Sequence, residues 1–278
     1  MRTALILVVV VVGSVLFHLL SPWWSTPIAS NWRYIDSTVS LTFWITGFVF
    51  IAVVLFTAYC VFRFRHQEGR RAAYEPENKK LELWLTVVTA VGVAALLAPG
   101  LYVWGQFVRS PDGASEIEVV GQQWQWSFRL PGKNGRLGAA DIRHVSPNNP
   151  LGLNPRDPNG RDDVVIEGGE LHLPLDKPVK VVLRSLDVVH DFYVPEFRAR
   201  MNLVPGMVTH FWFTPARTGT FDIILCAALW GVGHPMMRGK VVVDTETDYH
   251  AWLDEQKTFA QLSAPVTKGE GTIKSRFE

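Results

Sequence analysis

Long apolar runs open the chain, and their lengths determine what they predict. Residues 41–62 and residues 83–107 contain no charged side chain. A helix needs about 20 apolar residues to cross the hydrocarbon core of a bilayer, so both runs predict membrane-spanning helices. A shorter apolar run, residues 4–20, follows a basic start and precedes the small residue Ala29. These features also fit a cleaved leader, so residues 1–29 are either a signal peptide or a first transmembrane helix.

The loop between the two longer runs predicts how the chain is oriented. Its basic side chains are Arg63, Arg65, Arg70, Arg71, Lys79 and Lys80. Positively charged loops stay on the cytoplasmic side of a membrane. Residues 40–108 therefore predict a transmembrane helical hairpin in a bacterial inner membrane, with a cytoplasmic loop. The chain that follows is expected on the periplasmic side.

From residue 115 the pattern changes to short apolar runs separated by Gly, Pro and Asn. Such runs predict the strands of an all-β sandwich or barrel over residues 115–246. The runs are residues 116–121, 123–130, 163–168, 170–175, 179–185, 191–195, 209–215, 219–225 and 238–244. Residues 131–162 are rich in turn formers and predict a long insertion. Within residues 247–278 we expect one amphipathic helix, residues 247–262, and a polar tail.

Charge and cysteine content narrow the class of protein. The 278 residues carry a formal net charge of +1, which argues against nucleic acid as a partner. The cysteines are Cys60, inside an apolar run, and Cys226. Two such distant thiols do not form a disulfide framework, so Cys226 is a free thiol or a metal ligand.

Residues near the end of the β region carry the side chains of a copper site. Cys226, His234 and Met237 share one stretch, CAALWGVGHPMM, and His190 lies upstream. Thiolate, two imidazoles and a thioether are the ligands of copper electron-transfer sites. A lone buried His is more often a packed core residue, but these residue types in this order predict a metal site. The gap from Cys226 to His234 is long for one metal and suits a loop that folds around two.

Several motifs together resemble subunit II of haem-copper respiratory oxidases of the cytochrome c oxidase type. They are the loop just quoted, SLDVVHDFYVPEF (185–197), GQQWQWSF (121–128) and KLELW (80–84). The resemblance covers nearly the whole chain. It implies transmembrane helices followed by a periplasmic cupredoxin-like β-sandwich, and a family loop C-x-E-x-C-x3-H-x2-M that binds the dinuclear CuA centre.

The resemblance also assigns roles to residues whose pattern leaves alternatives open. Trp124 and Trp126 alternate along an expected strand, which predicts one shared face, either in the core or exposed. The resemblance implies that Trp124 receives electrons and that Trp126 is structural. Glu82 suits a helix N-terminus, where the dipole favours an acid. The resemblance makes Glu82 a carboxylate through which protons enter.

The chain departs from the family pattern in the centre itself. Trp230 stands where the family has its second bridging Cys, and Ala228 replaces the Glu that offers a carbonyl to copper and a carboxylate to Mg or Mn. Ala228 keeps only the carbonyl. Asn202 stands where an Asp is usual. One thiolate cannot hold a dinuclear core, so the prediction is zero or one copper per chain, held by His190, Cys226, His234 and Met237.

The resemblance implies an electron-input subunit that relays electrons from cytochrome c towards an oxygen-reducing subunit I. Its partners would be subunit I, other oxidase subunits, cytochrome c and the lipid bilayer. One alternative is a metal-free structural subunit of a quinol oxidase or related haem-copper reductase. Another is a membrane-anchored copper-binding module with no oxidase partner.

Overall fold

The computed structural model describes residues 1–21, 26–71, 74, 76–223 and 237–263 of the chain. Two compact units make up the molecule. Met1–Arg109 and Pro195–Arg198 form the first unit, and Ser110–Val194 and Ala199–Glu278 form the second.

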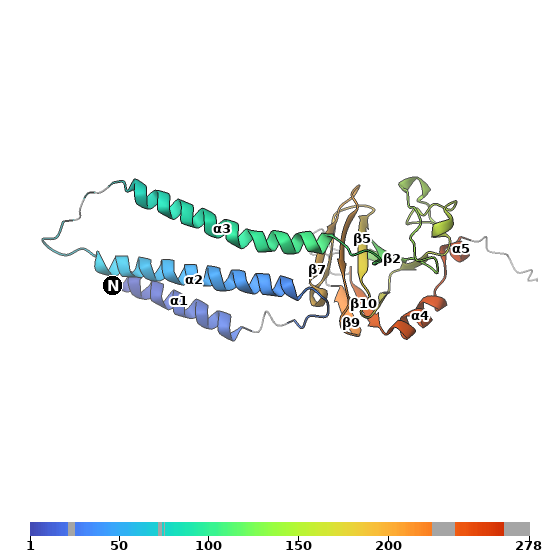
Figure 1. Cartoon of the computed structure of the whole chain (residues 1–278), viewed down its shortest axis with the longest axis horizontal. Coiled ribbons are helices and arrows are strands. Elements are labelled where there is room, and N and C mark those ends of the chain that lie inside the picture. The colour runs from blue at the N-terminus through green and yellow to red at the C-terminus, as the bar shows by residue number, and fades with distance from the viewer. Residues whose placement is uncertain (22–25, 72–73, 75, 224–236, 264–278) are drawn as a thin grey trace, which may run out of the picture. The chain divides into compact units, whose positions relative to one another are not determined.

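The first unit is built from three apolar helices (Figure 1). These are α1 (Arg2–Leu20), α2 (Arg33–Arg63) and α3 (Lys79–Val108). Each is long and apolar enough to cross a membrane. This confirms the two predicted spanning helices and shows that the first run is helical as well. The helix α1 packs along α2, where the rings of His18 and Phe43 lie 5.7 Å apart between their centroids.

Polar side chains inside these helices satisfy their hydrogen bonds within the helix. In α2 the hydroxyl of Thr42 donates to the carbonyl of Thr38, and the hydroxyl of Thr57 donates to the carbonyl of Val53. Such back-bonding satisfies these hydroxyls in a lipid environment that offers them no partner. At the start of α3 the side chain of Asn78 accepts from the N–H of Leu81, which fixes the first turn of that helix.

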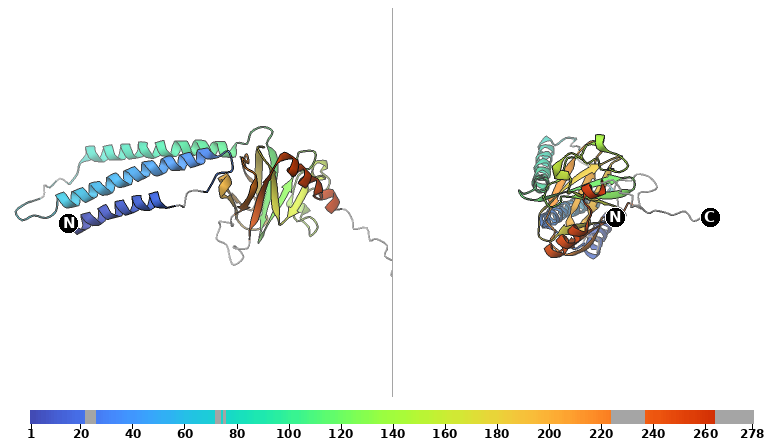
Figure 2. Two further views of the ribbon diagram at one scale, coloured as in Figure 1. Left: turned by 90° about the horizontal axis from the view of Figure 1, so that it is seen from below. Right: turned by 90° about the vertical axis from the view of Figure 1, so that its right-hand side faces the viewer.

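The second unit is a β-rich domain with short helices after its last strand. Its sheet elements are β1 (Ser115–Gln122), β2 (Gln125–Leu130), β3 (Val164–Glu167), β4 (Glu170–Pro174), β5 (Val179–Ser185), β6 (His190–Val194), β7 (Ala199–Leu203), β8 (Thr209–Phe213), β9 (Gly219–Ile223) and β10 (Gly239–Asp244). Short 3-10 helices lie at Ile142–His144 and Pro158–Gly160, and another, Pro195–Phe197, belongs to the first unit. The α4 helix (Glu246–Glu255) packs against β4 and β10, and α5 (Phe259–Leu262) follows it (Figure 2).

The strands pair in three groups. The largest has the order β3-β2-β1-β5-β8, a second has the order β4-β10-β9, and β6 pairs with β7. The pairs β1–β5 and β4–β10 are parallel, whereas β1–β2 and β6–β7 are antiparallel. Aromatic rings fill the core between them. Trp126 of β2 meets Phe192 of β6 edge-on with centroids 6.0 Å apart, and Phe192 lies 6.0 Å from Phe211 of β8.

Two details of this domain differ from the prediction. The strand β7 was not predicted, although ARMNL alternates apolar and polar residues as a half-buried strand does. The expected single helix over residues 247–262 is wrong, because the helix ends at Glu255 and a second one starts after Thr258. Thr258 forms a capping box with Gln261, which begins α5 as a separate helix.

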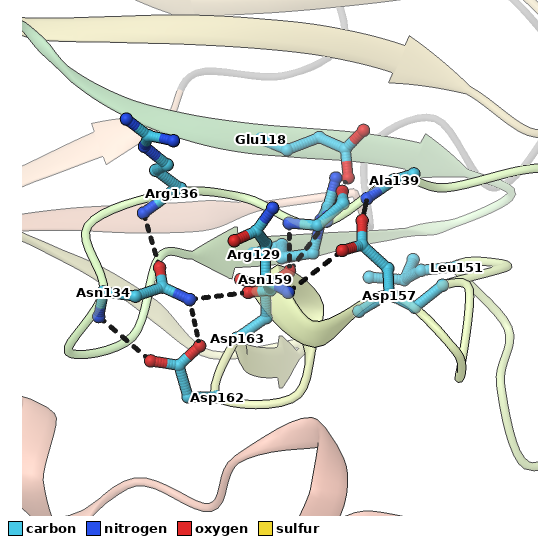
Figure 3. Close-up of polar contacts among 12 residues, drawn as sticks. Glu118, Arg129, Asn134, Arg136, Ala139, Leu151, Asp157, Asn159, Asp162 and Asp163 are labelled. Atoms are coloured by element: carbon cyan, nitrogen blue, oxygen red, sulfur yellow. Dashed lines mark hydrogen bonds and ion pairs between the residues drawn. The ribbon is translucent and has the colours of Figure 1, made fainter.

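The insertion between β2 and β3 covers the outer face of the large sheet. Its side chains Leu151 and Leu153 form an apolar cluster with Val120 of β1 and Phe259 of α5. Beside this cluster lies a group of buried charges, Glu118, Arg129 and Asp163, which we call the buried ionic cluster (Figure 3).

Arg129 is the centre of the buried ionic cluster. Its Nε donates to Glu118 over 2.8 Å, and its Nη1 donates to Asp163 over 2.8 Å and to the carbonyl of Gly138 over 2.6 Å. Burial alone would lower the pKa of Arg129, but Glu118 and Asp163 outweigh it and raise that pKa above its usual value. Glu118 also accepts from Arg184, which in turn donates to the carbonyl of Leu151. Charges of β1, β2 and β5 therefore hold the insertion at two points.

We expect Arg129→Met to lower the free energy of unfolding by about 3–5 kcal/mol, because it leaves Asp163 buried without a cation and leaves Glu118 only its bonds to Arg184. Urea unfolding of the detergent-solubilised chain, followed by near-ultraviolet circular dichroism, measures the change. Arg143→Met is the matched control, since Arg143 forms an ion pair with Asp141 at an exposed position. The control should unfold like the parent, and equal midpoints for both variants would contradict the role of the cluster.

Candidate functional site

His190 begins strand β6 and is 2% exposed. Its Nε2 lies 2.7 Å from Oδ1 of Asp187. An ionised carboxylate can only accept, so Nε2 carries the proton and donates. A metal would then coordinate at Nδ1, the other ring nitrogen. Carboxylates that hold the second nitrogen of a ligating imidazole in this way are a regular feature of metal sites.

Gly121 of β1 provides the seat for the His190 ring. A Cβ at this position would lie 2.9 Å from Cδ2 and 3.0 Å from Cγ of His190, closer than real Cβ contacts come. Glycine is therefore needed because the imidazole rests directly on the backbone. Trp126 borders the same ring edge-on, with centroids 6.2 Å apart. Strand β1, Trp126 and Asp187 together fix the orientation of His190.

Asp187 lies in the loop between β5 and β6, and its carboxylate accepts three hydrogen bonds. Oδ1 accepts from His190 and from the N–H of Val188 over 2.6 Å, and Oδ2 accepts from the N–H of Gln123 over 2.6 Å. Burial raises the pKa of Asp187, but the bonds from His190, Gln123 and Val188 outweigh it, so that the pKa lies below its usual value. The carboxylate is therefore held in its charged form.

Trp124 lies in the two-residue turn between β1 and β2. Gln122 and Gln125 pair directly across this turn, and the Trp124 side chain projects into solvent with 49% exposure. The prediction that Trp124 and Trp126 share one face is wrong, because the turn interrupts the strand after Gln122 and ends the alternation. Trp126 is buried in the core, whereas Trp124 is open to a partner.

Only part of the predicted ligand set can be located. His190 and Met237 are both buried, and a buried imidazole and thioether are ligand types that suit a mononuclear copper site. Cys226, Ala228, Trp230 and His234 lie outside the described residues. Within the ranges that the structure describes, no group of three or more His, Cys, Asp or Glu side chains is placed to hold a metal ion.

Asn202 lies on β7, opposite Asp191 in the β6–β7 pair. The hydroxyl of Thr209 donates to the Asn202 carbonyl over 2.7 Å. Asp191 is itself buried and accepts from Nε of Arg200 over 2.8 Å. Burial raises the pKa of Asp191, and Arg200 offsets only part of that effect. The Arg200 guanidinium also lies 5.5 Å from the ring centroid of Tyr193.

Glu82 lies in the first turn of α3, and its N–H donates to the carbonyl of Asn78. The structure thus places Glu82 at a helix N-terminus, where the helix dipole stabilises a negatively charged side chain. His172 has a structural role. It stacks on Trp252 of α4 with centroids 4.2 Å apart, and its Nδ1 lies 2.6 Å from Asp244.

Comparison with known proteins identifies the family. Residues 115–245 match the family described as "Cytochrome C oxidase subunit II, periplasmic domain". The chain is 70% identical over 263 residues, 95% of each chain, to the "Alternative cytochrome c oxidase subunit 2" of Bradyrhizobium diazoefficiens. The chain belongs to the cytochrome c oxidase subunit II family.

A more distant subunit II comes from Cereibacter sphaeroides. It is 26% identical over 241 residues, 84% of this chain and 78% of that protein. The crystal structure of the periplasmic domain of subunit II (CoxB) of Bradyrhizobium japonicum is similar to 52% of this chain and covers 95% of its own, with 25% identity and a TM-score of 0.39.

Membership of the family confirms several predictions. The fold is three apolar helices followed by a cupredoxin-like periplasmic domain, and the chain is a membrane-anchored subunit of an oxidoreductase complex. The family binds copper in general.

The sequence had not predicted roles for Gly121 and Asp187. Their signals are present, since Gly121 begins the GQQW motif and Asp187 stands three residues before His190.

Proposed function

We propose that this subunit II is the electron-input subunit of a haem-copper oxidase. Trp124 receives electrons from cytochrome c, and the β domain passes them towards subunit I through a mononuclear or degraded copper site. One observation carries the proposal. Trp124 is exposed on the turn after Gln123, and the Gln123 backbone shares a carboxylate with the candidate ligand His190.

Copper, when bound, would accept and release single electrons. The proposed ligands are His190, Cys226, His234 and Met237, with the backbone carbonyl of Ala228. The chain's own residues would bury these ligands and set the direction of the His190 ring. Buried ligands suit electron transfer, because a site without water reorganises little when its charge changes.

Glu82 and the membrane segments complete the proposal. Glu82 would serve as a proton-uptake carboxylate for subunit I at the cytoplasmic start of α3, in an inner membrane with the β domain in the periplasm. The basic side chains between α2 and α3 support this orientation. The apolar surfaces of α2 and α3 would pack on subunit I and on lipid.

A second candidate function is favoured by the missing thiolate at Trp230. A metal-free β domain would suit a structural subunit of a quinol oxidase. The experiment is to purify the oxidase through this subunit and to measure oxygen uptake with reduced cytochrome c or with a short-chain quinol. We expect cytochrome c to sustain turnover and quinol to fail.

Turnover with quinol alone would refute the proposed donor and favour the second candidate. Purification of the chain without any haem protein would refute both and indicate a free-standing copper-binding module.

A further inference from the structure

We propose that Asp187 is a positioning residue that couples the Trp124 turn to His190. One carboxyl group holds both, Gln123 through Oδ2 and His190 through Oδ1. This inference rests on the proposed function, because it takes Trp124 as the electron acceptor and His190 as a copper ligand. It goes beyond that function in naming the group that joins the two.

The loop that carries Asp187 is fixed by its own hydrogen bonds. The hydroxyl of Ser185 donates to the carbonyl of Val188 and accepts from the N–H of Asp187 over 3.3 Å. The N–H of Val188 donates to Oδ1 of Asp187 itself. These bonds hold the carboxylate in place before any partner binds. Short charge-assisted bonds of this kind are stronger than neutral ones.

The opposite side of the bridge is fixed as well. Gln123 directly precedes Trp124, so a bond to the Gln123 N–H restrains the exposed turn. The His190 ring cannot swing away from Asp187, because Gly121 lies beneath it and Trp126 beside it. The connection therefore runs through the Gln123 peptide, one carboxylate and one imidazole, with two hydrogen bonds and no gap through space.

The redox step along this connection is simple to balance. Copper held by His190 and the other proposed ligands would take up the one electron that a reduced cytochrome c gives up. No bond is broken and no proton is transferred. In this proposal Asp187 acts only by keeping its hydrogen bonds to Gln123 and His190. Its negative charge also increases the basicity of His190 towards a metal, as second-sphere carboxylates do.

The first test needs no metal. In the copper-free, detergent-solubilised chain, NMR with ¹⁵N-labelled histidine reports the tautomer of His190, and amide hydrogen exchange reports the Gln123 N–H. Asp187→Ala should allow the His190 proton to move from Nε2 to Nδ1, because Nε2 loses its acceptor, and it should accelerate hydrogen exchange at the Gln123 N–H. Asp191→Asn is the matched control, because it removes a neighbouring carboxylate that binds Arg200 instead. The control should change neither signal.

The second test uses the assembled, copper-loaded oxidase and cytochrome c carrying a photoreductant. Asp187→Ala should slow electron injection about 10- to 100-fold, with KM for cytochrome c unchanged. Trp124→Ala combined with Asp187→Ala should be no slower than the slower single variant, since groups that act as one unit are not additive. Asp187→Asn, which keeps one acceptor oxygen, should recover part of the rate.

Each outcome decides a defined part of the proposal. An unchanged His190 tautomer or unchanged Gln123 exchange in Asp187→Ala would overturn the bridge whatever the metal content. Losses that multiply in the double variant would show that Asp187 and Trp124 act independently, which also overturns it. A parent chain without copper would instead refute the proposed function and the coupling role, and the metal-free test would still decide whether Asp187 holds both partners.

Discussion

The purified chain should contain no more than one copper ion, and Trp230→Cys should raise the content to two. The CuA core requires two bridging thiolates, and the loop offers only Cys226. A single thiolate with two imidazoles and a thioether matches a mononuclear site. Metal analysis and the electron-spin spectrum distinguish the cases, since the hyperfine splitting of one copper nucleus differs from that of an electron shared by two.

Two further variants should be compared with Trp230→Cys. Trp230→Ser opens the same space without a thiolate and should still bind at most one copper. Trp230→Cys combined with Ala228→Glu should add a Mg or Mn site, because Ala228 already offers its carbonyl and lacks only the carboxylate. Two tightly bound coppers in the parent would overturn the prediction. A Trp230→Cys variant that binds no copper would show that the loop has lost more than one ligand.

Trp124→Ala should lower kcat for cytochrome c oxidation by an order of magnitude or more, with assembly and haem spectra unchanged. The side chain is half exposed and lies outside the core, so its removal costs little folding energy. It does remove the aromatic group that we propose as the electron acceptor, and electron tunnelling falls steeply with distance. Stopped-flow oxidation of reduced cytochrome c by the purified oxidase measures the loss.

Two further substitutions serve as controls for Trp124→Ala. Trp124→Phe keeps an aromatic ring and should retain part of the rate. Ile142→Ala removes an apolar side chain that is 80% exposed on the insertion of the same domain, and it should leave the rate unchanged. Equal turnover by the parent and Trp124→Ala would exclude this tryptophan as the electron acceptor.

Helices and most strands of this protein could be predicted because their patterns are local. Uncharged runs long enough to cross a bilayer predict membrane-spanning helices. Alternation of residue types in β5, whose residues are alternately buried and half-buried, predicts a strand directly. The same alternation gave a wrong prediction at the turn formed by Gln123 and Trp124. Alternating tryptophans continue through it in the sequence, while the backbone reverses direction between them.

The buried charges show a different limit. Glu118 and Arg129 lie on strands where polar residues normally face water, and nothing near them in the sequence indicates burial. They are buried because the insertion covers that face of the sheet. Asp187 and Gly121 were missed for a related reason. Gly121 contacts His190 only across strands, and spacing along the chain does not encode such a contact. Asp187 is three residues before His190, but the sequence does not show that its carboxylate points back to the imidazole.

The buried ionic cluster also leads us to expect a fixed order in which the β domain is completed. Arg129 and Glu118 lie on neighbouring strands, and Arg184 joins them from β5. If the insertion covered these charges before the strands had paired, the charges would be buried without partners, at a cost of several kcal/mol. The insertion should therefore close last, over a sheet already formed. Substitutions that weaken its attachment should then speed unfolding and leave the folding rate almost unchanged, because the transition state precedes closure.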